Sequence, residues 1–207
     1  WIQVLNYKEG LLPSFFCVII CKKDMWSPCW IWKSEIPENI CDEIINCSSA
    51  TNFHRGLTQQ GEEDLERVVN IKFLNEEFNW INSLSLGYII FANGANFNYN
   101  LSYSDKEGVQ LSRYSKGQFY SKHVDFNGNS KMKAHTRKLS MSIQLSDENS
   151  YDGGELILYY AGEKFVTPKL KGSVIVFDSR LTHEVTPVTD GERYSLVKWF
   201  HGDEPLK

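Results

Sequence analysis

Residues 117–125 read GQFYSKHVD, a glycine-containing turn that runs into a short strand. Successive side chains of a strand point to opposite faces, so His123 and Asp125 are expected to share one face. A carboxylate and two imidazoles on one side of a metal leave further positions open, an arrangement that suits non-haem Fe(II) oxygen chemistry. Because His-x-Asp arises easily by chance, the prediction of a metal site depends on a second histidine elsewhere in the chain.

The second histidine is found among β-branched runs in the C-terminal part of the chain. Residues 172–177 read GSVIVF, a strand expected to end at the turn-like residues that follow it. His183 then opens a further extended run over residues 183–188. We therefore predict that His123, Asp125 and His183 ligate one metal ion.

An anion-binding pair is predicted downstream of this histidine. The dipeptide Asp190-Gly191 is a strong hairpin signal and leads into a strand over residues 193–199. Alternation along this strand places Arg193 and Ser195 on one face. The guanidinium offers two N–H donors in a fixed fork and the hydroxyl offers one more, so the two side chains can bind a single carboxylate.

Each of these residues has an ordinary structural explanation when it is taken alone. A single surface histidine or aspartate is usually solvated, a lone tyrosine is more often a core aromatic, and an isolated arginine usually pairs with an acid on a strand face. The order, the spacing and the strand context of the whole set favour a functional site over these alternatives.

From about Val109 to Pro205 the sequence resembles the catalytic core of the Fe(II)/2-oxoglutarate-dependent dioxygenases, most closely the prolyl 4-hydroxylase-like branch with its PKHD-type hydroxylases. The matching positions are Tyr114, His123-x-Asp125, residues 151–156 (YDGGEL), residues 172–177, residues 183–188, Arg193-Tyr194-Ser195 and Trp199. The resemblance implies a mainly β (α+β) fold, a double-stranded β-helix or distorted jelly roll, with the metal inside one open end and N-terminal helices as buttresses. It also implies Fe(II), 2-oxoglutarate and O2 as cofactor and cosubstrates, and it allows for ascorbate as a supporting factor.

The resemblance also implies roles for individual residues. Arg193 and Ser195 would hold the distal carboxylate of 2-oxoglutarate, and Tyr114 would assist them. Gln144, on the run 139–145, is a further candidate for a polar contact to 2-oxoglutarate, with strand packing as an equal alternative. Gly153-Gly154 is expected only to turn the chain into a strand.

The implied activity is hydroxylation of an unactivated C–H bond, with a prolyl residue of a protein or peptide as the first choice of substrate. The same chemistry on another amino acid or on a small molecule stays open. A cupin-like metal-binding protein would share the barrel, but Arg193-Tyr194-Ser195 argues against it. A non-enzymatic binding domain would not need the ligand set His123, Asp125 and His183.

Composition fits one compact enzyme. The 207 residues, 42% of them hydrophobic, are expected to form one domain, with N-terminal strands and buttressing helices in residues 1–108 and the catalytic core in residues 109–207. A formal net charge of −4 argues against a general nucleic-acid binder. No stretch approaches the roughly 20 apolar residues that span a bilayer. Residues 11–20, the longest apolar run, lack the flanks of a signal peptide and are expected to form a strand.

Cysteine usage indicates a reducing compartment. The five cysteines, Cys17, Cys21, Cys29, Cys41 and Cys47, are odd in number and show neither a CxxC pair nor a matching histidine pair. We therefore expect reduced thiols and a cytoplasmic location.

Two helices and a strand are predicted ahead of the core. A helix with Ser34 as its cap and Pro37 in its first turn is expected to run to Ser48-Ser49, and residues 67–73 read as a strand. A second helix is expected from Asn75 to about Asn93-Gly94. Its apolar stripe is interpreted as core packing and consists of Phe78, Ile81, Leu84, Tyr88, Phe91 and Ala92.

Residues 126–137 form a polar, glycine-containing segment directly after the first two predicted ligands. We expect a mobile surface loop there, and a lid over the metal site is its functional interpretation. His135 lies in this loop and is not expected to be a metal ligand.

Overall fold

The structure is a computed structural model that describes residues 27–46, 53–56, 66–74, 78–103, 107–126 and 136–202. The expected strand at residues 11–20, the expected helix start at Asn75 and most of the loop 126–137, with His135, lie outside the described residues. Within the described ranges, no helix is long and apolar enough to cross a membrane. Of the five cysteines, Cys29 and Cys41 fall in these ranges, the first half-buried and the second buried.

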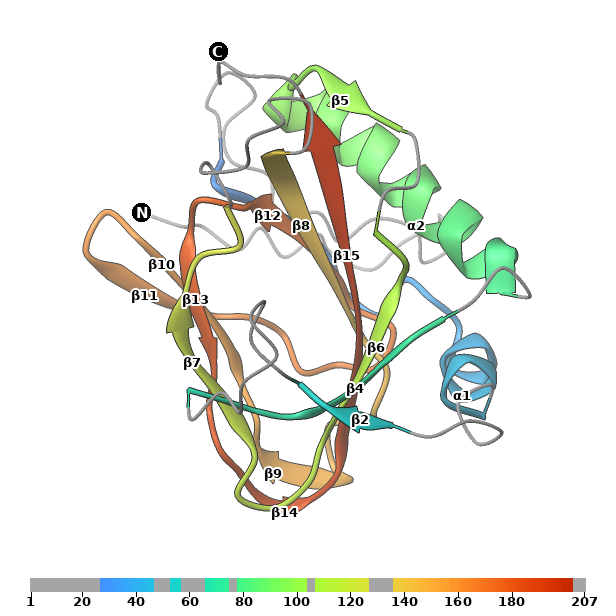
Figure 1. Cartoon of the computed structure of the whole chain (residues 1–207), viewed down its shortest axis with the longest axis vertical. Coiled ribbons are helices and arrows are strands. Elements are labelled where there is room, and N and C mark those ends of the chain that lie inside the picture. The colour runs from blue at the N-terminus through green and yellow to red at the C-terminus, as the bar shows by residue number, and fades with distance from the viewer. Residues whose placement is uncertain are drawn as a thin grey trace, which may run out of the picture.

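Two antiparallel sheets face each other and form the body of the molecule (Figure 1). The strands of the major sheet are β1 (Cys29–Trp32), β2 (His54–Arg55), β4 (Asn70–Phe73), β5 (Leu101–Ser102), β6 (Gln110–Tyr114), β8 (Thr136–Gln144), β12 (Val174–Asp178) and β15 (Arg193–Gly202). Their order is β1-β12-β8-β15-β6-β4-β2, and β5 pairs with β15. Strands from before and after residue 109 therefore share one sheet.

The second, minor sheet carries the strands around the predicted histidines. Its strands are β3 (Arg67–Val68), β7 (Phe119–His123), β10 (Leu156–Tyr160), β11 (Glu163–Val166) and β13 (Thr182–Val185), in the order β11-β10-β13-β7-β3. A separate two-stranded ladder joins β9 (Tyr151–Gly153) to β14 (Val188–Gly191). Two facing sheets of this kind confirm the predicted mainly β fold, a double-stranded β-helix.

Helices α1 (Glu38–Asn46) and α2 (Asn79–Ala92) lie on the outer side of the major sheet, as predicted for buttressing helices (Figure 1). The predicted cap of the first helix is wrong, because α1 begins only at Glu38 and Ser34 lies too far ahead of it. The backbone N–H of Ser34 instead donates to the Ser173 hydroxyl at 3.2 Å. This bond ties the chain ahead of α1 to the loop that precedes β12.

The two faces of strand β8 contact different layers of the molecule, the helices on one side and the minor sheet on the other. Its apolar residues pack toward the helices, whereas the residues between them are polar and face the other sheet, because side chains alternate along a strand. The first set is Leu139, Met141 and Ile143, and the second set is Ser140, Ser142 and Gln144. A second apolar cluster, with Tyr114, Leu158, Phe177 and Val185 among its members, joins residues of both sheets. The space between the sheets therefore has apolar walls and one polar face.

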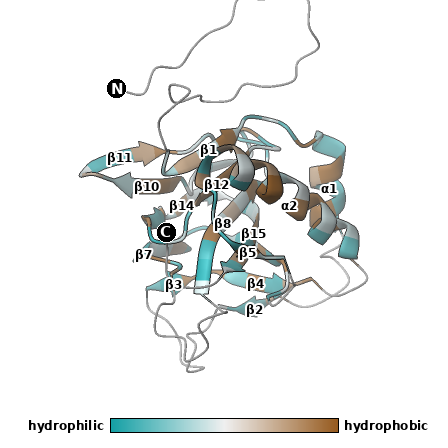
Figure 2. Ribbon diagram, turned by 90° about the horizontal axis from the view of Figure 1, so that it is seen from above, coloured by the Kyte–Doolittle hydropathy of each residue, from teal (hydrophilic) through white to brown (hydrophobic). Residues whose placement is uncertain are grey.

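The apolar stripe of α2 is core packing with one exception. Ile81 and Ala92 are fully buried, and the partly buried residues Phe78, Leu84 and Tyr88 pack against the same cluster. Much of the α2 ribbon has the brown of apolar residues in Figure 2. The prediction for Phe91 is wrong, because this side chain is 49% exposed. Its ring lies at the edge of the cluster, with ring centroids 6.1 Å from Trp30 and 5.9 Å from Trp32.

The α-helical part of α2 ends beside Asn93-Gly94, as predicted. The α-helix ends at Ala92, but the chain continues into a π-helical turn, η2, over Asn93–Phe97. The Asn93 side chain holds this wide turn, since it donates to the Tyr99 carbonyl at 2.9 Å and accepts from the Tyr99 amide at 2.8 Å. Asn98, in the left-handed conformation, then ends the turn.

The strand predicted over residues 67–73 is split between the two sheets. β3 belongs to the minor sheet and β4 to the major sheet, so the chain crosses from one to the other at Val69. Val69 is 0% exposed within the cluster between the sheets, and its carbonyl accepts the Gly56 N–H at 2.8 Å. A continuous β-branched run predicts extended backbone correctly but cannot show that its two halves pair with different sheets.

The hairpin predicted at Asp190-Gly191 is also wrong. These two residues belong to β14 and pair with Asp152 and Tyr151 of β9, while the following strand, β15, lies in the major sheet. Gly191 has a φ of +72°, and a Cβ there would lie 2.2 Å from the Ser150 carbonyl oxygen. Gly191 therefore does mark a bend of the chain. The bend connects β14, which pairs with β9, to β15 in the major sheet, and the two strands beside it do not pair with each other.

Gly153 offers a test of this packing. Its φ is +71°, and an added Cβ would lie 2.1 Å from the Pro187 carbonyl oxygen. We expect Gly153→Ala to lower the free energy of unfolding by at least about 2 kcal/mol, because backbone strain and a steric clash add together. The matched variant Gly87→Ala, in α2 with nothing within 4 Å of the new Cβ, should raise it by about 0.5–1 kcal/mol. Urea unfolding measures both, and equal effects would contradict this packing.

Candidate metal and cosubstrate site

The three predicted metal ligands converge in the structure. The ligand atoms of His123, Asp125 and His183 all lie within 4.8 Å of one another. The two histidines are direct partners across β7 and β13, with ring centroids 4.1 Å apart. Register between these two strands is therefore what brings together residues 60 positions apart in the chain.

Asp125 reaches the cluster by a route that differs from the predicted one. Strand β7 ends at His123, so Asp125 is not part of the strand alternation. Instead, the backbone N–H groups of Asp125 and Phe126 both donate to the Ser179 carbonyl, at 3.0 and 2.9 Å. The turn after β12 thus anchors the carboxylate, while the prediction that it lies beside His123 is correct.

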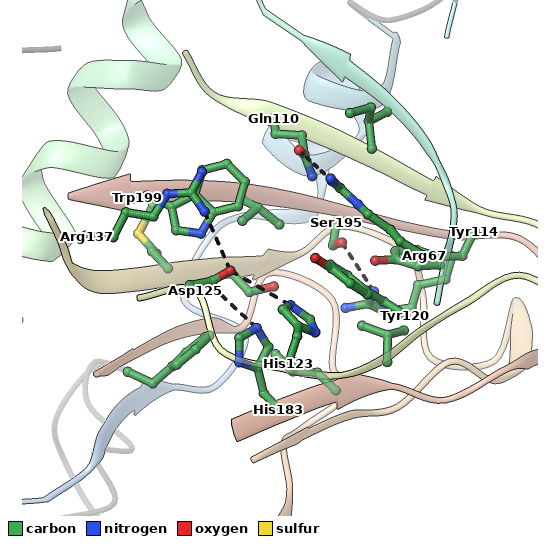
Figure 3. A pocket seen from close by; sticks show the side chains of 18 of the residues that line it. Arg67, Gln110, Tyr114, Tyr120, His123, Asp125, Arg137, His183, Ser195 and Trp199 are labelled. Carbon is green, nitrogen blue, oxygen red and sulfur yellow. Dashed lines mark hydrogen bonds and ion pairs between the residues drawn. The ribbon is translucent and has the colours of Figure 1, made fainter. Parts of the chain in front are cut away.

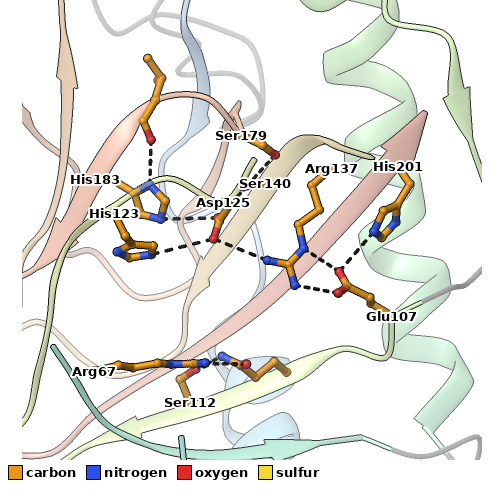
Figure 4. Close-up of polar contacts among 12 residues, drawn as sticks. Arg67, Glu107, Ser112, His123, Asp125, Arg137, Ser140, Ser179, His183 and His201 are labelled. Atoms are coloured by element: carbon orange, nitrogen blue, oxygen red, sulfur yellow. Dashed lines mark hydrogen bonds and ion pairs between the residues drawn. The ribbon is translucent and has the colours of Figure 1, made fainter. Parts of the chain in front are cut away.

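The histidine rings are oriented by backbone carbonyls. Nδ1 of His123 lies 2.7 Å from the Ser121 carbonyl oxygen, and Nδ1 of His183 lies 3.0 Å from that of Leu181. A carbonyl only accepts, so each Nδ1 carries the proton and each Nε2 presents a lone pair. The Nε2 atoms face Asp125, at 3.8 Å from Oδ1 for His123 and 3.5 Å from Oδ2 for His183 (Figure 4).

This donor set fits a divalent first-row metal ion. Metal–ligand bonds of about 2.1 Å at right angles to one another place two ligand atoms about 3 Å apart. The Nε2–carboxylate distances in this structure, 3.5 and 3.8 Å, are slightly longer. Burial lowers the pKa of His123 to about 4, with a contribution from His183. Burial alone would raise the pKa of Asp125, but His183, His123 and Arg137 together bring it below its usual value. A neutral imidazole and an ionised carboxylate are the forms in which these side chains bind metals.

Polar neighbours fix the Asp125 carboxylate. Its Oδ2 accepts from the Ser140 hydroxyl at 2.8 Å, and Ser140 in turn lies 2.9 Å from the Ser179 hydroxyl (Figure 4). Arg137 approaches Oδ1 at 3.9 Å. Because such outer partners orient a metal ligand, they support the site as a preformed one.

Sequence reasoning missed Arg137, which it placed in the loop 126–137. The structure puts it in β8, whose register with β15 shifts between Phe200, opposite Leu139, and His201, opposite Arg137. The extra residue, Lys138, makes a β-bulge and reverses the alternation of side chains beyond it. Arg137 therefore lines the cavity, although counting back from Ser140 would point it toward the helices.

Arg137 is held by an acid and an aromatic ring. Its Nε and Nη2 donate to the Glu107 carboxylate at 2.9 and 2.6 Å, and its guanidinium lies 3.9 Å from the centroid of the Trp199 ring. His201 places Nε2 at 3.4 Å from the same carboxylate. Burial alone would raise the pKa of Glu107, but hydrogen bonds from His201 and Arg137 lower it to about 2.

We expect the contacts of Glu107 with Arg137 and His201 to make the free energy of unfolding fall at acidic pH. Because the pKa of Glu107 is depressed in the folded state, its stabilisation is full above the ordinary value of 4.5 and is lost as pH falls toward about 2. Glu107→Gln should lower the free energy of unfolding at pH 7 by about 1–3 kcal/mol and flatten its fall below pH 5. Urea unfolding at both pH values tests this. The exposed control Glu163→Gln should behave as the parent, and an unchanged profile in Glu107→Gln would contradict the pairing.

The predicted anion site is also assembled. Arg193 is only 3% exposed, its Nη1 donates to the Ser195 hydroxyl at 3.3 Å, and Tyr114 is its direct partner across β6 and β15. The guanidinium carbon lies 5.5 Å from the centroid of the Tyr114 ring. Gln144 accepts from Arg193 Nε at 3.1 Å and donates to the Tyr151 hydroxyl at 2.9 Å. Tyr151, to which the sequence analysis gave no role of its own, therefore holds the amide that orients the arginine.

One cavity of about 410 Å³ connects these groups. It is lined by the three metal-ligand candidates, by Tyr114, Arg193 and Ser195, and also by Arg67, Tyr120, Arg137 and Trp199 (Figure 3). Gln144 is absent from this lining. The cavity is thus open to a metal at one place and to an anion at another.

Comparison with known proteins agrees with this geometry. Residues 109–201 match the model of the 2OG-Fe(II) oxygenase superfamily. A PKHD-type hydroxylase of Synechococcus sp. is 41% identical over 92 residues, which are 43% of this chain and 39% of that protein. Another, of Maricaulis maris, is 35% identical over 91 residues, which are 44% of this chain and 40% of that protein. The chain thus spans about two fifths of the length of these curated relatives.

The fold has solved counterparts. A prolyl hydroxylase from Trichoplax adhaerens, solved with a peptide fragment of the hypoxia inducible factor oxygen degradation domain, aligns with a TM-score of 0.69 and 19% identity over 84% of each chain. At this identity the likeness concerns the fold alone. The family match spans the segment that carries His123, Asp125, His183 and Arg193, so residues 109–201 of this chain are similar to the 2OG-Fe(II) oxygenase superfamily.

Proposed function

We propose that the protein is an Fe(II)- and 2-oxoglutarate-dependent dioxygenase that hydroxylates an unactivated C–H bond, with a prolyl residue of a protein or peptide as the first candidate. One observation carries this proposal: the cluster of His123, Asp125 and His183 opens into the same cavity as the buried pair Arg193 and Ser195. A three-residue facial ligand set leaves metal positions free for other ligands. A buried guanidinium without an acid beside it among the described residues needs an anion to neutralise it.

The chain's own residues supply ligation and orientation. His123 and His183 would bind the metal through Nε2 and Asp125 through a carboxylate oxygen, since their other polar atoms are already engaged. When bound, Fe(II) with 2-oxoglutarate and O2 supplies the oxidising power, which no side chain possesses. Ser140 and Arg137 keep the Asp125 carboxylate in place.

The part of the cavity that would bind 2-oxoglutarate contains the guanidinium of Arg193 and the hydroxyl of Ser195. Arg193 would take the distal carboxylate of 2-oxoglutarate, and Ser195 and Tyr114 would add hydroxyl donors. The amide oxygen of Gln144 already accepts a hydrogen bond from Arg193 Nε. We therefore assign Gln144 to positioning the arginine, in place of the direct contact considered from the sequence.

The choice of a peptide substrate is supported by similarity. The Trichoplax prolyl hydroxylase, with which this chain shares its fold, was solved with a peptide, and the curated relatives are PKHD-type hydroxylases. Another amino acid or a small molecule remains the alternative substrate of the same chemistry.

The test is succinate release from 2-oxoglutarate with Fe(II), O2 and a panel of proline-containing peptides, together with mass spectrometry of the peptides. We expect metal-dependent succinate and a peptide heavier by one oxygen atom, and loss of both in His183→Ala. Succinate without a modified peptide would move the substrate to the alternative class. A protein that neither binds 2-oxoglutarate nor releases succinate would contradict the proposed activity.

A further inference from the structure

Arg67 brings a third guanidinium group to the cavity, besides those of Arg137 and Arg193. It lies in β3, at the edge of the minor sheet, directly opposite Tyr120 of β7. Its side chain crosses toward the major sheet, where Nη2 donates to Gln110 Oε1 of β6 at 3.0 Å (Figure 3). Arg67 therefore spans the cavity wall at the point where the chain passes between the two sheets.

The guanidinium is held in a fixed orientation. Gln110 is 4% exposed and donates its Nε2 to the Ser112 hydroxyl at 2.8 Å, which leaves Oε1 facing Arg67 (Figure 4). The guanidinium carbon also lies 5.1 Å from the centroid of the Tyr120 ring. Because Gln110 and the Tyr120 ring already fix its rotamer, the Arg67 side chain would lose little conformational entropy on binding a ligand. Arg67 is therefore preorganised for ligand binding.

Arg67 differs from the other two arginines of the cavity in its partners. Arg137 is paired with Glu107 and Arg193 with Ser195 and Gln144. Across the described residues, Gln110 is the single hydrogen-bond partner of Arg67, no carboxylate pairs with it, and its buried Nε has no acceptor. An unpaired N–H and an unneutralised charge in a partly buried wall are costly unless a ligand satisfies them.

When the formal charges of the metal- and 2-oxoglutarate-loaded site are added, the charge of Arg67 is the one without a counter-charge. A divalent metal and Arg193 would be balanced by Asp125 together with the two carboxylates of 2-oxoglutarate, and Arg137 is balanced by Glu107. One positive charge then remains in the cavity, on Arg67. It lies near the reaction centre, because Tyr120 stacks on the ligand His123 with ring centroids 3.5 Å apart.

We propose that Arg67 binds a carboxylate of the substrate, so that the enzyme prefers substrates that carry a negative charge close to the hydroxylated carbon. This inference rests on the proposed function and specifies its substrate class. The carboxylate could belong to an acidic residue beside the target residue of a peptide, or to a free amino acid. Both sources present the same planar anion to the fork.

The experiment measures binding to the Mn(II)- and 2-oxoglutarate-loaded protein by titration calorimetry. The probes are a Glu-flanked proline peptide, its Gln-flanked counterpart and its Lys-flanked counterpart, and the small pair L-proline and L-prolinamide. We expect the charged member of one pair to bind about ten- to a hundredfold more tightly than its uncharged counterpart, as for a charge-assisted hydrogen bond. Which pair shows the difference identifies the source of the carboxylate.

Variants of Arg67 then assign the preference to this residue. Arg67→Gln should abolish the difference within the pair, and Arg67→Lys should keep part of it. Arg67→Glu should reverse the preference toward the Lys-flanked peptide. Arg113→Gln is the matched control, because Arg113 makes the same kind of contact, 4.6 Å from the Phe53 ring, but does not line the cavity. This control should keep the parent preference.

Four outcomes would overturn the inference. Equal binding within both pairs, or no binding by any probe, would show that no substrate carboxylate is recognised. A preference that persists in Arg67→Gln would place the recognition elsewhere. A loss of 2-oxoglutarate affinity in Arg67→Gln as large as that in Arg193→Ala would assign Arg67 to the cosubstrate. Metal-dependent succinate release, measured in parallel without any probe, shows separately whether the proposed activity itself holds.

Discussion

Replacing Asp125 with asparagine is expected to abolish tight metal binding while leaving the fold intact. Asparagine keeps an oxygen that accepts the Ser140 hydroxyl bond at the same place, but the anionic ligand is gone. Loss of an outer partner typically lowers metal affinity by about 10–100-fold, so loss of the ligand itself should cost at least about a hundredfold. Succinate release should fall to the level of the metal-free protein.

Mn(II) titration measures this directly. The thermal shift that Mn(II) produces in the parent should disappear in Asp125→Asn, because a ligand stabilises only the state that binds it. Asp152→Asn, at an exposed position of β9, is the matched control and should bind Mn(II) as the parent does. Parental affinity in Asp125→Asn would mean that the carboxylate is not a ligand.

Replacing Arg193 with alanine is expected to remove most of the affinity for 2-oxoglutarate and little of the affinity for metal. Loss of a charge-assisted contact in a buried site costs about 2–5 kcal/mol, or at least about thirtyfold in affinity. Ser195→Ala removes one neutral donor and should cost about 1 kcal/mol. Arg193→Lys keeps the charge without the fork and should fall between parent and alanine.

The readout is titration of 2-oxoglutarate into Mn(II)-loaded variants. Gln144→Leu should weaken binding less than Arg193→Ala, because Gln144 acts through Arg193 Nε. An unchanged affinity in Arg193→Ala would mean that another cation that lines the cavity, Arg67 or Arg137, holds the distal carboxylate.

Local sequence signals predicted much of the metal and anion site. Arg193 and Ser195 share one face of a single strand, so short-range geometry suffices for that pair. His123 and Asp125 are close in sequence, but the carboxylate is placed by the bonds of its backbone segment to the Ser179 carbonyl. What joins the pairs is the register of β7 with β13 and of β15 with β6. The resemblance to a known family implied that long-range arrangement, which periodicity alone does not contain.

The residues that sequence reasoning missed depend on departures from regular strands. Arg137 enters the cavity because of a bulge at Lys138, and Arg67 enters it because the chain changes sheets at Val69. A bulge reverses every side chain beyond it, and it leaves no clear mark in a polar stretch. Both arginines therefore look like ordinary surface charges in the sequence.

The incorrect hairpin prediction has a similar origin, and the correctly predicted helix end shows the same principle. Asp190-Gly191 marks a real bend, but only tertiary packing decides that the bend joins two ladders. The helix-stop signal at Asn93-Gly94 ends the α-helix at Ala92, yet the Asn93 side chain bonds extend the chain into a π-turn. In each case the local signal identified a change of backbone direction and could not identify its partner.

The central claim is that a metal held by His123, Asp125 and His183 and an anion held by Arg193 belong to one ligand-binding unit. Titration of 2-oxoglutarate into the protein with and without Mn(II) tests it most directly. The account predicts one molecule of 2-oxoglutarate bound per chain with Mn(II) present, and at least about tenfold weaker binding without it, since the metal adds ligand bonds to the Arg193 contact. Equal affinity with and without Mn(II) would contradict the claim.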